Sequence, residues 1–122
     1  SSLHRLAIPF LFKMLVEHEN FSWFSEKEAE GIENPSKSGY PFLWGTAVFE
    51  DPHVIIEIDE KHSEEEIHKY AIGRPIGYAE DIVLTVRFTE RDLIHIFGCD
   101  YWRKGRKLYE RRIKEKDRAE EI

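Results

Sequence analysis

The sequence lacks the residue patterns that mark several common kinds of functional site. One cysteine, Cys99, among 122 residues excludes an internal disulfide and suits a reducing compartment. No zinc-ligand spacing, glycine-rich nucleotide loop or nucleophile-triad motif is present. No apolar run reaches the about 20 residues that span a bilayer, and no small-residue cleavage site follows Val16. We therefore expect a cytoplasmic protein that needs no cofactor and does not bind a membrane.

The net charge of −6 combines two regions of opposite charge. Residues 1–100 hold 9 Lys/Arg against 19 Asp/Glu, whereas residues 101–118 hold 9 Lys/Arg against 3 Asp/Glu. A basic segment on an acidic body can bind an anionic ligand or pair with an acidic surface of the same protein. The pI near 5.5 argues against broad nucleic-acid binding, so any such contact would be local.

Hydrophobic residues make up 41% of the chain, which is typical of a globular domain. The spacing of these apolar residues predicts a domain that contains both strands and helices. The predicted strands are 21–24, 54–58, 67–72, 82–88 and 93–97. The predicted helices are Leu3–Leu15, 26–33 after a capping box at Ser25 and Glu28, 42–49, and a basic helix carrying Trp102, Tyr109 and Ile113 on one stripe. Four consecutive strands joined by short turns imply a four-stranded antiparallel meander packed with helices, an α+β fold.

Several short motifs occur in a fixed order along residues 21–112. They are Phe21-x-Trp23-x-x-Glu26-Lys27, Asn34-x-x-Lys37-x-Gly39, Phe42-x-x-x-x-Ala47-x-Phe49-x-Asp51-Pro52, Glu66-x-His68, Phe88-Thr89-Glu90-Arg91 and Tyr109-Glu110. In this order and spacing the chain resembles the BrnT family of bacterial toxins, which are small ribonucleases with a RelE-like α+β fold that pair with an antitoxin. The resemblance implies a BrnT-like domain at 21–122, preceded by an amphipathic helical extension at 1–20.

The same resemblance implies the toxin of a type II toxin–antitoxin system, a metal-independent ribonuclease. The ribose 2′-hydroxyl would attack the adjacent phosphate, which requires a base, an acid and cations near the phosphate. For catalysis we single out His95, His68 and Arg87, since histidine titrates in the right range and arginine grips phosphate in a bidentate manner. For RNA binding we single out a lysine shared with the family and residues of the basic helix: Lys37, Arg103, Lys104, Arg106 and Tyr109.

A structural role is an alternative for each of these residues. Five polar positions depart from the family. Phe24 stands where the family has aspartate and Ser38 where it has histidine, and the family has arginine where this chain has His68, His95 and Asp100. Both histidines could be hydrogen-bonded structural residues, and the basic helix could be a solvated face. The alternative function is therefore a catalytically inactive BrnT-like domain that acts as a protein-binding or regulatory module.

The register of the 82–97 hairpin decides the surroundings of His95. A two-residue turn at 90–91 places it opposite Val86 on an apolar face, whereas a three-residue loop at 89–91 places it opposite Thr85 on a polar face. His62, Glu64, Glu65 and His68 could form a metal site, but a strand would scatter these residues over both faces.

The apolar stripe from Leu3 to Leu15 predicts either a helix that covers a face of its own sheet or one that offers an apolar surface to another chain. The recognisable domain begins only at Phe21, so this helix is not required to close its core. We expect it to mediate a homodimer, beside the antitoxin and RNA as the other partners.

Overall fold

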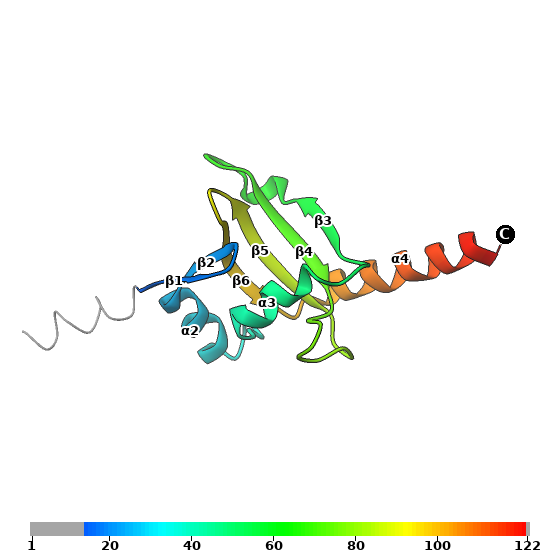
Figure 1. Cartoon of the computed structure of the whole chain (residues 1–122), viewed down its shortest axis with the longest axis horizontal. Helices are drawn as coiled ribbons and strands as arrows, with labels where there is room; N and C mark the ends of the chain where they lie inside the picture. Colours follow the sequence, from blue (N-terminus) through cyan, green and yellow to red (C-terminus); the bar gives the residue numbers. More distant parts are fainter. Residues whose placement is uncertain (1–13, 122) are drawn as a thin grey trace, which may run out of the picture.

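The computed structural model describes residues 14–121, which build an α+β unit around one sheet (Figure 1). Most of the helix predicted for Leu3–Leu15 lies outside these residues. Leu15 itself lies in a strand, paired with Phe24, and not in a helix. The division at residue 20 stays a prediction, as does the contact through the N-terminal stripe.

The predicted four-stranded antiparallel meander is wrong, because the sheet has six strands and is mixed. The strands are β1 (Leu15–His18), β2 (Phe21–Phe24), β3 (Ile55–Ile58), β4 (His68–Gly73), β5 (Leu84–Glu90) and β6 (Ile94–Asp100), in the order β1-β2-β6-β5-β4-β3. Strands β3 to β6 form the expected antiparallel ladder. Strand β2 then adds to β6 in parallel, and β1 pairs with β2 as the outermost strand.

Burial of two aromatic residues explains why β2 joins the sheet. Phe21 and Trp23 are only 8% and 4% exposed, and both belong to the main hydrophobic core. Pairing with β6 carries these side chains onto the face that also holds Ile96. Removing each side chain from water contributes about 1.5–3 kcal/mol to stability.

Two of the helices were correctly predicted from the sequence. Helix α2 (Ser25–Glu33) contacts β2 and β6, and α3 (Phe42–Val48) packs across β4, β5 and β6. Glu28 does not complete the predicted capping box. Its carboxylate accepts a hydrogen bond from the backbone N–H of Phe42 over 2.6 Å, so α2 supplies the acceptor that the start of α3 lacks.

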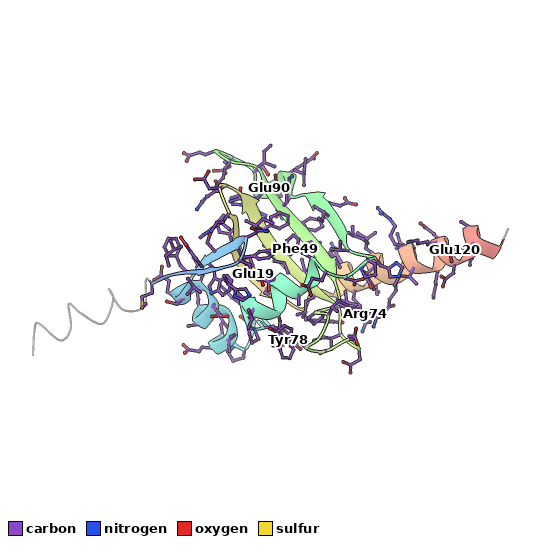
Figure 2. The ribbon with its side chains drawn as sticks, viewed as in Figure 1. Glu19, Phe49, Arg74, Tyr78, Glu90 and Glu120 are labelled. Atoms are coloured by element: carbon purple, nitrogen blue, oxygen red, sulfur yellow. The ribbon has the colours of Figure 1, made fainter. Side chains whose placement is uncertain are left out.

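Helix α4 (Arg103–Glu121) packs on the opposite face of the sheet, against β4 and β5. Adjacent residues of a strand point to opposite faces, so Ala71 faces the core under α3 whereas Ile72 faces Tyr109 of α4. The Tyr109 hydroxyl donates to Asp51 Oδ2 over 2.7 Å, which ties α4 to the segment after α3. Residues 114–120 of the helix are exposed on all sides, and this part of α4 projects past the sheet (Figures 1 and 2).

Helix α4 contacts β4 and β5, and within residues 14–121 no helix covers the end of this face near the β5–β6 loop, which we refer to as the open face. No helix between residues 14 and 121 combines the length and the apolar character needed to cross a membrane.

Candidate functional site

A row of polar side chains crosses the part of the sheet face that α4 does not cover. Directly paired residues on neighbouring strands share a face, and the pairs Ser22–His95, His95–Thr89 and Thr89–His68 run through β2, β6, β5 and β4. Arg87 lies two residues from Thr89 and shares this face. The fold therefore brings the three predicted catalytic residues onto one face of the sheet, where His68 and Arg87 are partly exposed and His95 is buried.

A β-bulge places Phe97 between the two histidines. Phe88 pairs with Ile96 and Arg87 pairs with Gly98, so Phe97 is the extra residue of β6. Its ring centroid lies 4.6 Å from that of His68 and 5.2 Å from that of His95. Because the histidines are two strands apart, about 10 Å, they do not act directly on each other.

His95 occupies neither of the two predicted registers. The β5–β6 loop comprises residues 91–93, and His95 pairs with Thr89 instead of Val86 or Thr85. The side chain is 4% exposed, and its Nδ1 shares a 3.0 Å hydrogen bond with Ser22 Oγ. Burial, with a contribution from Arg91, lowers the pKa of His95, which favours the neutral imidazole at pH 7. A buried, neutral His95 supports the site from beneath rather than contacting a ligand.

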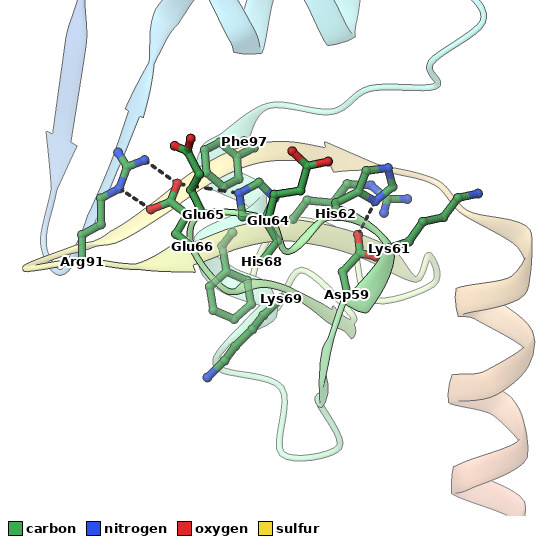
Figure 3. A pocket seen from close by; sticks show the side chains of 12 residues that line it. Asp59, Lys61, His62, Glu64, Glu65, Glu66, His68, Lys69, Arg91 and Phe97 are labelled. Atoms are coloured by element: carbon green, nitrogen blue, oxygen red, sulfur yellow. Dashed lines mark hydrogen bonds and ion pairs between the residues drawn. The ribbon is translucent and has the colours of Figure 1, made fainter.

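His68 lines an open hollow of about 1080 Å³ beneath the segment that joins β3 to β4 (Figure 3). Its Nε2 lies 3.7 Å from Glu66 Oε1. Arg91 Nη2 holds the same oxygen at 2.8 Å and Nε holds the other at 3.3 Å. This hydrogen bonding from Arg91 lowers the pKa of Glu66 and keeps the carboxylate ionised beside the imidazole.

Arg87 lies where this hollow meets a second one of about 410 Å³, and it lines both together with Phe97. Its Nε is 3.2 Å from Asp100 Oδ2, and its guanidinium lies 5.3 Å from the Trp102 ring centroid. Burial raises the pKa of Asp100, although Arg87 opposes the rise. The Arg87 guanidinium is thus held in place by the partly buried Asp100 carboxylate, for which burial disfavours the charged form.

Lys37 reaches the second hollow from the loop after α2. The backbone of this loop follows the end of β6, with a bond from Tyr40 N–H to the Cys99 carbonyl over 2.8 Å. The Lys37 ammonium binds Glu30 Oε1 at 2.8 Å. The structure therefore brings Lys37 and Arg87 to one hollow, and His68 and Arg87 to the other.

The predicted RNA-binding residues of the last helix divide into two groups. Arg103 and Lys104 are exposed at the start of α4. Tyr109 is 1% exposed, so the structure gives it a packing role in place of an RNA contact. Arg106 is partly buried, with its guanidinium 5.8 Å from the Tyr101 ring centroid and its Nε 3.5 Å from Glu110.

The four residues considered as metal ligands, His62, Glu64, Glu65 and His68, all line the larger hollow. Even so, no three His, Cys, Asp or Glu side chains between residues 14 and 121 are grouped as a metal ion would require. His62 instead pairs with Asp59 over 2.8 Å (Figure 3).

Sequence reasoning missed Ser22, Phe97 and the Glu66–Arg91 pair. The first two enter the site through strand pairing between distant segments and through a bulge, neither of which leaves a local pattern. A further group, the cations on the outer side of α4, could have been found from helical spacing.

Comparison with known protein families finds no match to the chain, and comparison with curated proteins finds none either.

Proposed function

We propose that the protein is a ribonuclease of the toxin–antitoxin type, acting on RNA bound across the open half of the sheet. The observation that carries the proposal is the position of Arg87 between two hollows, with His68 in one and Lys37 in the other. Cations beside a histidine on a concave surface supply what phosphodiester cleavage by a neighbouring hydroxyl requires. The motif resemblance to BrnT toxins points to the same chemistry.

The roles follow from the surroundings of each side chain. His68 takes the proton from the ribose 2′-hydroxyl, and Glu66 stabilises the imidazolium that forms. The 2′ oxygen bonds to phosphorus, Arg87 and Lys37 face the charge of the phosphorane, and the bond to the 5′ oxygen breaks. A solvent proton completes the leaving hydroxyl. The products are a 2′,3′-cyclic phosphate and a 5′-hydroxyl end.

Purified protein and a labelled single-stranded RNA test this proposal. We expect His68→Ala to slow cleavage by about 10²-fold or more, the usual contribution of a general base. Arg87→Gln should slow it by about 10²–10³-fold, as for loss of a transition-state donor. His62→Ala is the matched control, since His62 lines the same hollow and also pairs with a carboxylate. Equal effects of the two histidine variants would refute the assignment.

A catalytically silent binding module is the second candidate, and one observation favours it. Arg87 pairs with Asp100, Arg91 with Glu66 and Lys37 with Glu30. The cations that would bind phosphate are therefore already neutralised by carboxylates of the same chain. Intact RNA and normal growth on expression of the unaltered chain would support this candidate. An antitoxin partner in the cytoplasm, and a homodimer, belong to either reading and require co-purification and light scattering.

A further inference from the structure

The outer side of α4 carries a continuous stripe of cations. At about 100° per residue, six basic residues fall within roughly 100° of the helix circumference. They are Arg103, Lys104, Lys107, Arg111, Lys114 and Arg118. The core-facing residues Gly105, Tyr109 and Ile113 lie on the opposite side. We refer to these six residues as the outer stripe.

The cations of the outer stripe are not engaged with carboxylates. All six are exposed, and among the side chains of residues 14–120 none of them forms an ion pair. The two ion pairs of α4 use other residues, Arg106 with Glu110 and Arg112 with Glu57. Between Arg103 and Arg118 no acidic residue lies inside the stripe, since Glu110 and Glu115 fall at its edges. This contrasts with the hollows, where most cations are paired.

The outer stripe starts beside the open face of the sheet. Trp102, which carries Arg87 against its ring, directly precedes Arg103. From there the stripe runs about 22 Å along α4, at 1.5 Å per residue, past the edge of the sheet. A chain that leaves the open face at Arg87 would therefore meet the stripe next.

We propose that the outer stripe binds the phosphate backbone of a single RNA strand that extends from the open face. This inference rests on the proposed function for the identity of the polymer. A row of unpaired cations along a helix is the electrostatic footprint of a nucleic-acid contact. Tyr101, 37% exposed just before the stripe, offers a ring on which a base can stack.

The composition of the stripe favours RNA over an acidic protein. Protein interfaces have an apolar centre, whereas nucleic-acid interfaces are polar and strongly positive. The stripe contains no apolar side chain, and after Ile113 no large apolar residue follows up to residue 121. A polymer of regularly spaced charges fits such a surface.

The test is the salt dependence of binding to a labelled 2′-O-methyl RNA strand, which lacks the attacking hydroxyl and cannot be cleaved. For single strands the slope of log K against log salt is about −0.7 per phosphate, so the six stripe contacts contribute about −4 to the total slope. The double variant Lys107→Gln/Lys114→Gln should bind more weakly, with a slope shallower by about 1.4. Lys116→Gln is the matched control, because Lys116 is exposed on the same helix but outside the stripe. It should leave the slope unchanged.

Three outcomes would overturn the inference: an equal effect of Lys116→Gln, an unchanged slope in the double variant, or tighter binding of duplex RNA or polyglutamate than of the single strand. Circular dichroism checks that each variant is folded. Stripe-dependent binding without cleavage of ordinary RNA would reject the ribonuclease alone, whereas cleavage with an unchanged slope would reject the stripe alone.

Discussion

Replacing Tyr109 by phenylalanine removes one hydroxyl from the interior and decides whether this residue serves the fold or the ligand. The hydroxyl donates to Asp51 Oδ2, and the Asp51 carboxylate also accepts the backbone N–H groups of Arg74 and His53, each at 2.8 Å. A hydrogen bond to an ionised group contributes about 1.5–3 kcal/mol to stability. We expect Tyr109→Phe to lower the free energy of unfolding by that amount.

The titration of Tyr109 gives the pH range in which this residue makes stability depend on pH. Burial, followed by the hydrogen bond to Asp51, raises the pKa of Tyr109 from 10.0 to about 12. As the pH rises, the unfolded state loses this proton first, so stability does not change through this group below pH 10 and falls between pH 10 and 12. A pKa difference of about 2 corresponds to a fall of about 2.7 kcal/mol in the free energy of unfolding over this range.

Urea denaturation followed by tryptophan fluorescence measures the effect, and an unchanged m value confirms that the denatured state is comparable. At pH 7.5 the variant should be less stable than the unaltered protein, and the gap should narrow as the pH passes 10. Tyr78→Phe is the control, since Tyr78 is 47% exposed. A stability within about 0.5 kcal/mol of the unaltered protein, together with weaker RNA binding, would refute the packing role.

Three further predictions concern other positions in the fold. His95→Gln should make the melting temperature less sensitive to acid between pH 7.5 and 5, because burial lowers the pKa of His95 and the unfolded state therefore binds an extra proton below about pH 6.5. Parallel profiles of melting temperature against pH for the variant and the unaltered protein would contradict this. Gly31→Ala should stabilise α2 by up to about 1 kcal/mol, because no atom lies within 4 Å of the new Cβ, whereas Gly39→Ala should destabilise the protein, because its Cβ would lie 2.4 Å from the Gly31 backbone. Equal melting temperatures of the two variants would count against both predictions. Cys99, 2% exposed with a thiol pKa raised by burial, should resist Ellman's reagent in the folded protein and react in urea, and rapid labelling of the folded protein would disprove its burial.

Local elements could be predicted from the sequence because their signals lie within a few residues. The aromatic strand at Phe21, the short helix at Phe42 and the stripe through Tyr109 and Ile113 are all confirmed. What failed was the pairing between distant segments. Nothing near Phe21 shows that its partner is Ile94, because only the completed core makes that parallel contact favourable.

The candidate site shows the same division. That His68 and Arg87 lie on neighbouring strands follows from the strand order, and they do share a face. The surroundings of His95 could not be predicted, since the two registers placed the loop at 90–91 or 89–91, whereas the actual loop at 91–93 pairs His95 with Thr89. Burial of Tyr109 could have been foreseen from its place on the apolar stripe. The sequence alone does not reveal the acceptor at Asp51.

The parallel pairing of β2 with β6 has a consequence during synthesis on the ribosome. Ser22 and His95, which share a hydrogen bond, are separated by 73 residues, so the strand made almost first must wait for nearly the last strand to emerge. At about 5–20 residues per second, the wait lasts roughly 4–15 s. Throughout it, Phe21 and Trp23 have no finished core to enter. We expect this sheet to close only after β6 leaves the exit tunnel, so a ribosome-bound chain of any shorter length has an unfinished sheet.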